Sequence, residues 1–151
     1  MRKIEDEIQQ SHFSSPEQKA HINIVYTAYY LSSRLEKKMK KYDINLAQFN
    51  ILRIVKGQNG NPISIKDTQN RMIHKMANTS RIVHTLVEKE LIHREISQTD
   101  KREVWITMTS KGEFILLQIN EILDRFLLSQ FSHITKEEIE TLNTILDKIR
   151  Y

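Results

Sequence analysis

Apolar residues recur with the period of an α-helix over most of the chain and alternate as in a β-strand over one short stretch. The helical period predicts helices at about residues 16–42, 45–56, 64–72, 75–90, 110–131 and 135–149. Alternation predicts two strands, at 91–96 and 103–108, joined by six polar or charged residues. Residues 1–14 are polar and are expected to be frayed. The pattern therefore predicts a mainly α (α+β) chain with one small hairpin.

Most of the predicted helices begin at residues that can cap the free N–H groups of a first turn. Ser15, Asn45 and Ser64 each stand before a helical stretch and carry a side chain that can accept such a hydrogen bond. Ser110 and Thr135 are each followed three residues later by a glutamate, which is the pattern of a capping box. A brief break at residues 73–74 separates two of the helices.

The helix predicted at 75–90 has two faces of different composition. The apolar face, which we expect to be buried, comprises Met76, Thr79, Val83, Leu86 and Val87. The opposite face carries no carboxylate before Glu88. A short helix, a tight break, a basic-faced helix and a long-tipped hairpin together are typical of a winged helix-turn-helix.

The helices at both ends of the chain have more apolar surface than one core requires. Apolar residues at 16–42 fill two stripes rather than one, and the last two helices also have wide apolar faces. We therefore expect a winged-helix lobe at about 44–109 and a dimerisation region at about 16–42 and 110–151. At 151 residues, the whole chain is expected to be a single domain.

Composition narrows the possible functions. The chain has no cysteine, which excludes disulfides and thiolate metal sites, and its three glycines form no phosphate-binding loop. No apolar run is long enough to span a membrane or to form a signal peptide, so we expect a cytoplasmic protein without a membrane partner. Residues 63–112 contain nine basic and six acidic side chains, whereas residues 113–151 contain four and seven. A basic middle and an acidic tail favour an anionic polymer bound by the middle.

Three segments resemble the MarR-type winged-helix transcriptional regulators. The sharpest is Asp100-Lys101-Arg102 followed by the strand and turn at 106–112, which is similar to the family's wing signature. Residues 78–92 resemble the family's recognition helix and the segment that follows it, and residues 46–52 resemble the helix that precedes the DNA-reading unit. The resemblance covers about residues 22–149 and implies a homodimer that binds double-stranded DNA.

The sequence departs from the family pattern at three positions. Glu90 stands where glycine is usual, which predicts that this helix end cannot use a left-handed cap. His74 stands where a serine or aspartate cap would be expected. Met108 replaces a leucine of similar volume. None of these changes removes a group that binds DNA.

The DNA-binding residues expected on the recognition helix are Lys75, Asn78, Ser80, Arg81 and His84. Those expected on the wing are Arg94, Asp100, Lys101 and Arg102. Asn78 can bond an adenine edge and Arg81 a guanine edge, whereas Arg102 suits a narrow minor groove. Three of these residues also have a plainer interpretation. Asn78 can be a polar surface residue, Arg81 can pair with Glu88 or another local carboxylate, and Asp100 can be an ordinary turn residue.

The sequence gives weaker signals for a small-ligand site than for DNA binding. Tyr26 and Tyr30 lie one helical turn apart and are candidates for an effector cleft. The resemblance implies that such an effector is a small aromatic or anionic molecule, bound between the dimer helices and the DNA-binding lobe. The six histidines show no metal-ligand spacing, so we expect no metal and no cofactor.

The leading hypothesis is a homodimeric, sequence-specific transcriptional regulator, a repressor that binds a pseudo-palindromic operator. The alternative is an architectural protein that binds DNA without sequence preference. A winged protein-interaction module without a DNA role is a third possibility. No catalytic motif can be identified, so an enzyme is not expected.

Overall fold

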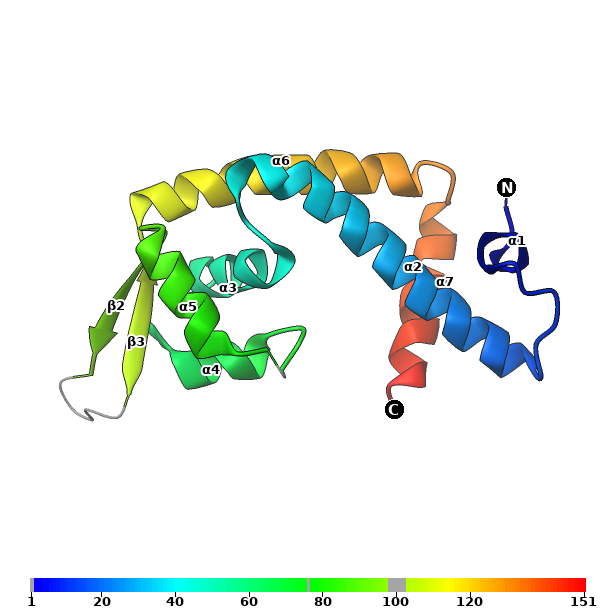
Figure 1. The fold of residues 1–151 in the computed structure, drawn as a ribbon, viewed down its shortest axis with the longest axis horizontal. Coiled ribbons are helices and arrows are strands. Elements are labelled where there is room, and N and C mark those ends of the chain that lie inside the picture. Colours follow the sequence, from blue (N-terminus) through cyan, green and yellow to red (C-terminus); the bar gives the residue numbers. More distant parts are fainter. Residues whose placement is uncertain (1, 76, 98–102) are drawn as a thin grey trace. The chain divides into compact units, whose positions relative to one another are not determined.

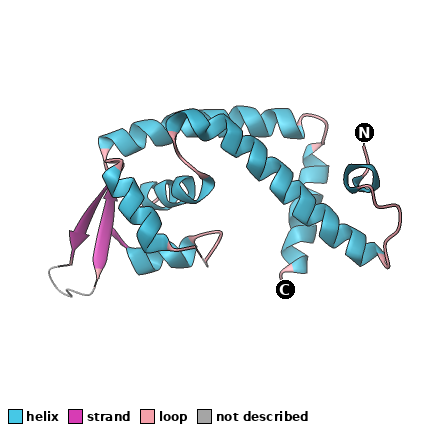
Figure 2. Cartoon of the chain, in the orientation of Figure 1, coloured by secondary structure: helices cyan, strands magenta, loops and turns pink. Residues whose placement is uncertain are grey.

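The computed structural model describes residues 2–75, 77–97 and 103–151. The chain is mainly α, and its strands form one small sheet (Figures 1 and 2). It divides into two compact units, residues 1–46 and residues 47–151, which we describe separately. No helix in the described part of the chain combines the length and the apolar character needed to cross a membrane.

The first unit contains α1 (Ile4–Ile8), α2 (Pro16–Met39) and the short 3-10 helix η1 (Lys40–Tyr42). Ser15 caps α2 as predicted, because its side chain accepts a hydrogen bond from the N–H of Gln18. The expectation that residues 1–14 are frayed is wrong for α1. Its Ile4 is buried, and its Glu5 forms a 2.5 Å ion pair with Lys19 of α2. These contacts supply the stability that so short a helix lacks alone.

The second unit contains the winged helix and two longer helices. Its elements, in order, are α3 (Leu46–Lys56, whose first residue belongs to the first unit), β1 (Ile63–Ser64), α4 (Ile65–Arg71), α5 (Thr79–Glu88), β2 (Ile92–Ile96), β3 (Val104–Met108), α6 (Ser110–Phe131) and α7 (Lys136–Ile149). The sheet is antiparallel with the order β1-β3-β2, and β3 pairs with both neighbours. The sequence predicted β2 and β3 but missed β1, which has only two residues.

The core of this unit gathers side chains from α3, α5 and the sheet. Its least exposed apolar residues, at 0–2% of their accessible surface, include Ile51, Leu52, Val55, Val83, Leu86, Ile92 and Ile106. Thr79, Val83 and Leu86 of α5 are buried, as the apolar stripe predicted, and Met76 lies outside the described residues. The core therefore holds one face of α5 inward and leaves the other exposed.

The start of α5 differs from the prediction. The helix begins at Thr79 rather than near Lys75, because Asn78 caps it: its Oδ1 accepts a 3.0 Å hydrogen bond from the N–H of Arg81. The link between α4 and α5 is also anchored from outside, since the N–H of Ile73 donates to Oδ1 of Asn50 in α3 at 3.0 Å. Specific hydrogen bonds thus set where the exposed face of α5 begins.

The end of α5 corrects a second prediction. Glu90 adopts a left-handed conformation with φ of 60°, the cap that its side chain was expected to prevent. The N–H of Glu90 donates to the carbonyl of Val87, and the N–H of Leu91 donates to that of Leu86, which together form a Schellman motif. Lys111 contacts the Glu90 carboxylate at 2.8 Å and holds its pKa below the ordinary value.

The turn between β3 and α6 packs closely on this same corner. Thr109 caps α6, one residue before the capping-box pattern of Ser110 and Glu113, because its Oγ1 accepts from the N–H of Gly112 at 2.9 Å. The same hydroxyl donates to the carbonyl of Glu90 at 2.8 Å. A Cβ on Gly112 would lie 2.1 Å from the carbonyl oxygen of Leu91, so only glycine permits this approach.

The last two helices follow their predicted limits closely. Thr135 and Glu138 form the expected capping box at the start of α7. Both helices leave apolar side chains exposed, among them Phe114, Leu117, Leu128, Leu142, Ile145 and Ile149. No residue of α7 is buried, although its apolar positions recur with a regular helical period.

Candidate nucleic-acid interface

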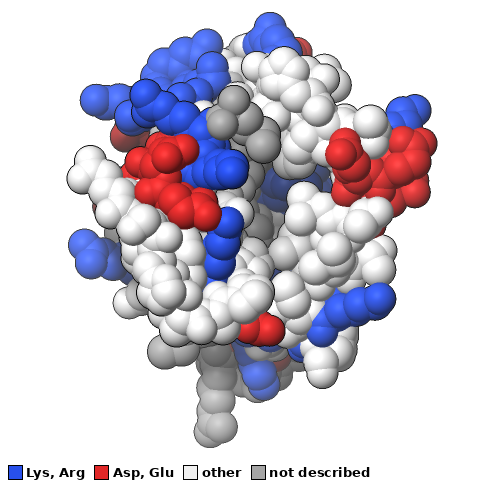
Figure 3. Space-filling model, turned by 90° about the vertical axis from the view of Figure 1, so that its right-hand side faces the viewer, with Lys and Arg blue, Asp and Glu red and all other residues white. Residues whose placement is uncertain are grey.

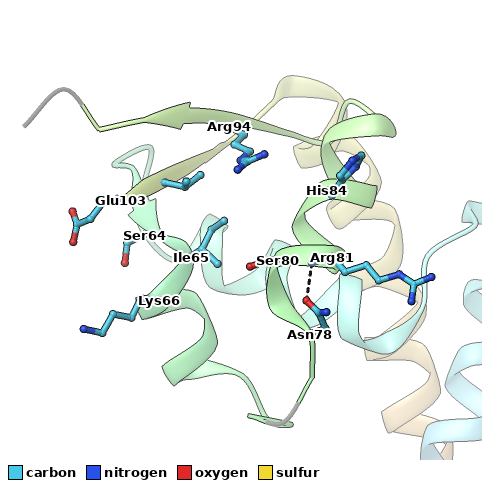
Figure 4. Close-up of a pocket in the computed structure, with 10 residues that line it drawn as sticks. Ser64, Ile65, Lys66, Asn78, Ser80, Arg81, His84, Arg94 and Glu103 are labelled. Atoms are coloured by element: carbon cyan, nitrogen blue, oxygen red, sulfur yellow. Dashed lines mark hydrogen bonds between the residues drawn. The ribbon is translucent and has the colours of Figure 1, made fainter. Parts of the chain in front are cut away.

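A groove of about 790 Å³ lies between α4, α5 and the strands β2 and β3 (Figure 4). The residues that line it are Ser64, Ile65, Lys66, Asn78, Ser80, Arg81, His84, Arg94, Glu103 and Val104. Five of them are predicted DNA-binding residues, four from α5 and its cap and Arg94 from β2. Folding thus brings four of the five predicted recognition-helix residues and the predicted strand residue Arg94 to a single concave surface.

The groove is predominantly cationic. Lys66, Arg81 and Arg94 line it, and Glu103 is the single carboxylate among the lining residues that the structure describes. Figure 4 shows the guanidinium of Arg81 extending away from Lys66 and Glu103. Positive groups spread across a groove suit a polyanion better than a small anion, because several phosphates can be contacted at once.

Asn78 has a structural role that the sequence did not predict. Its Oδ1 serves as the cap of α5, and Figure 4 marks this hydrogen bond. The two-atom contact with an adenine edge needs that same oxygen, so base reading by Asn78 would compete with capping. Its amide nitrogen has no such role in the cap. The base contact of Asn78 stays a prediction.

Arg81 and His84 occupy successive turns of the exposed face of α5. Within the described residues, the partner of Glu88 is Nδ1 of His84, at 3.5 Å, rather than Arg81. The alternative in which Glu88 neutralises Arg81 is therefore not the arrangement found. Arg81 also lies at the N-terminal end of α5, where free backbone N–H groups and the helix dipole favour an anion.

The remaining predicted DNA-binding residues are placed differently. Lys75 is exposed in the link before α5, where its carbonyl accepts from Nε2 of Gln69, and it does not line the groove. Asp100, Lys101 and Arg102 of the wing tip lie outside the described residues.

Five of these lining residues were missed from the sequence, among them the three polar residues Ser64, Lys66 and Glu103. Ser64 was identified only as a helix cap; its hydroxyl accepts from the N–H of Asp67 and donates to the carboxylate of the same residue. Lys66 lies in the first turn of α4, and Glu103 precedes β3. The cap at Ser64 was a usable signal for Lys66, because it places the next residues in an exposed first turn.

The two tyrosines proposed for an effector cleft belong to the first unit. The hydroxyl of Tyr26 donates to Oε2 of Glu7 at 2.8 Å, and this hydrogen bond, with desolvation, raises the pKa of Tyr26. The guanidinium of Arg34 lies 4.4 Å from the ring centroid of Tyr30. Both side chains therefore have partners within their own unit.

The described residues do not group their possible metal ligands into a site. Within residues 2–75, 77–97 and 103–151, no three His, Cys, Asp or Glu side chains are grouped as a metal site would require. Figure 3 shows a face on which groups of acidic side chains lie directly beside basic side chains. The groove is distinguished from that face by its excess of one sign of charge.

Comparison with known proteins identifies relatives of this fold. Residues 44–104 match the sequence model of the MarR family. The HTH-type transcriptional regulator MgrA of Staphylococcus aureus is 28% identical over 113 residues, which cover 75% of this chain and 74% of that protein.

Two solved structures have folds that resemble about nine-tenths of this chain. The organohalide-sensing regulator RdhR in its 2,4-dichlorophenol-bound form gives a TM-score of 0.83 at 22% identity, covering 90% of this chain and 80% of that one. The MepR–DNA complex of S. aureus gives 0.75 at 20% identity, covering 89% and 96%. At these identities the likeness establishes the fold, and the predicted mainly α winged helix is confirmed.

Proposed function

We propose that this chain is a MarR-type homodimeric regulator that represses transcription by binding a pseudo-palindromic DNA operator, since its winged-helix segment matches that family's model and it is similar to MgrA. The observation that carries the proposal is the cationic groove, because it places α5 beside Arg94 of the wing strands. The relative MgrA is a transcriptional regulator rather than an enzyme, which agrees with the lack of a catalytic motif.

In the proposed complex, α5 enters the major groove of a duplex. Arg81 is close enough to the start of α5 to meet a guanine edge or a phosphate, and Ser80 supplies a hydroxyl beside it. Arg94 and Lys66 contact phosphates on either side of the helix and fix its register without reading sequence. The wing tip, through Arg102, is proposed to reach the adjacent minor groove.

A second copy is proposed to cover the exposed apolar side chains of α6 and α7. Apolar area of this kind on a small protein marks an interaction surface. A two-fold axis would place two α5 helices about one turn of DNA apart, which is the spacing that a pseudo-palindrome requires.

Regulation by a small aromatic or anionic effector is proposed for the surface near Tyr26 and Tyr30. The structural relative RdhR was solved with 2,4-dichlorophenol, which supports this class of ligand. To act, the effector must bind one dimer geometry more tightly than the other, since equal binding shifts no equilibrium.

The proposal is tested by selecting bound duplexes from a random DNA pool and measuring their affinity at stated salt. A selected duplex should bind about 10³-fold or more tightly than a random one. Arg81→Ala and Arg94→Ala should weaken binding, whereas Arg125→Ala, an exposed residue of α6, should not. Equal affinity for selected and random duplexes would instead indicate the architectural alternative.

A further inference from the structure

We propose that Glu103 is a specificity-determining residue of the DNA-binding groove, which it protects from non-specific contact with the phosphate backbone. This inference rests on the proposed function and deepens it. Glu103 is exposed, follows the wing tip and directly precedes β3 (Val104–Met108). Among the lining residues that the structure describes, its carboxylate is the single negative group, and the positive groups are Lys66, Arg81 and Arg94.

The position of Glu103 makes this charge effective. Figure 4 shows the Glu103 carboxylate and the Lys66 ammonium extending toward the same side, with Ser64 between them. Within the described residues Glu103 forms no ion pair with Lys66 or Arg94, although all three line the groove. With respect to the described residues, this negative charge is therefore unpaired and can interact with a ligand that enters the groove.

A carboxylate distinguishes between two parts of a duplex. It repels a phosphate, and it accepts a hydrogen bond from an exocyclic amine, as cytosine offers in the major groove. In a mismatched register, phosphates of the backbone meet the rim where Glu103 lies. In a matched register, the cations take the phosphates and Glu103 meets a base edge or solvent. The penalty thus falls mainly on the wrong complexes, which is how a repulsive group creates specificity.

The test compares two duplexes of about 30 bp, one selected from a random pool by the wild-type chain and one of random sequence. Glu103→Gln removes the charge and keeps the shape. The matched control is Glu95→Gln, because Glu95 is exposed on β2 and does not line the groove. Affinities are measured at about 0.1 M and about 0.3 M salt, where screening differs.

We expect Glu103→Gln to tighten binding of the random duplex by roughly tenfold at the lower salt, about threefold from each protomer, since one like charge is removed from each groove. Binding of the selected duplex should change by less than about twofold, so the ratio of the two affinities falls. The gain on random DNA should shrink at the higher salt. Glu95→Gln should leave both affinities unchanged.

Two results would overturn the inference alone: unchanged affinities in Glu103→Gln, or an equal change on both duplexes. Either would leave the selected duplex bound by the wild-type chain and the proposed function intact. A wild-type chain that binds neither duplex would overturn the proposed function and this inference together.

Discussion

Helices α5 and α7 are both amphipathic, yet they differ in what covers their apolar faces. In α5, Val83 and Leu86 are 1% and 0% exposed, because α4 and the strand β2 pack against this helix. In α7, Leu142 and Ile145 are 42% and 50% exposed, and no residue of the helix is buried. Both helices thus have the same apolar periodicity, but other elements of the chain bury the apolar face of α5 and leave that of α7 exposed.

The difference separates two tasks. Burial on one side of α5 fixes its backbone, so that its other side presents Arg81 and His84 in defined positions. We propose that a partner surface covers the exposed apolar side chains of α7. We therefore expect changes in α5 to act on folding and changes in α7 to act on assembly.

The largest effect is expected from the double change Leu142→Glu and Ile145→Glu. Two charges on the apolar face of α7 should abolish the proposed dimer, because they cannot be desolvated there. Loss of the second binding site should weaken operator binding by about 100-fold or more. Light scattering and DNA titration measure the two effects. Thr144→Glu, an exposed position on the side of α7 opposite its apolar residues, is the control, and a double variant that remains dimeric would show that α7 is not the interface.

Leu86→Ala should cause the largest loss of folding stability in α5. Removing a fully buried side chain leaves a cavity and should lower the free energy of unfolding by about 2–5 kcal/mol. Denaturant unfolding at a fixed protein concentration measures it. His84→Ala, on the exposed face of the same helix, should leave the midpoint unchanged. Similar losses in both variants would mean that burial does not distinguish the two faces.

Asn78→Ala should remove the N-cap of α5 and lower the free energy of unfolding by about 1 kcal/mol. Asn78→Asp should retain most of that stability, because a carboxylate oxygen caps equally well. If the alanine variant keeps full stability but loses base preference at one operator position, Asn78 reads DNA rather than capping the helix.

A smaller effect is expected at the other end of α5. Glu90→Gly should raise Tm by about 2–4 °C, because glycine adopts the left-handed conformation at position 90 without strain. Calorimetry measures this shift. Glu88→Gly, within the helix, should lower Tm instead. A lower Tm in Glu90→Gly would mean that the contact with Lys111 outweighs the backbone strain.

The smallest effect concerns pH. Lys111 lowers the pKa of Glu90 below its ordinary 4.5, so this pair stabilises the fold above about pH 4.5 and loses its contribution as the pH falls through the lowered pKa. The difference in stability between wild type and Lys111→Met should therefore shrink in acid. Unfolding curves at pH 7 and pH 3.5 test this, and a constant difference would exclude ionic pairing as its cause.

Much of the secondary structure was accessible from the sequence. Caps and apolar periods predicted α2, α3, α6 and α7 closely, because those signals are local. Two exceptions depend on contacts distant in the sequence, because α1 is held by Lys19 and β1 by pairing with β3. The start of α5 depends both on the local cap at Asn78 and on the link that Asn50 anchors.

The candidate site was predicted less completely. The exposed residues of α5 and the strand residue Arg94, which the sequence predicted to bind DNA, line the same groove, since periodicity shows which side of an element is exposed. Lys66 and Glu103 were missed, because only the packing of α4 against α5 and the sheet brings them to the same groove. The functional roles of these residues remain predictions.

Asn50 shows how a residue outside the groove can influence it. Its side chain, on α3 (Leu46–Lys56), fixes Ile73 in the link that leads into α5. A substitution at position 50 would remove this hydrogen bond, and in the proposed DNA complex it would thereby alter the angle at which Arg81 approaches a base pair. Related proteins with identical DNA-contacting residues would then prefer different operators, so an inventory of contact residues alone cannot predict their targets.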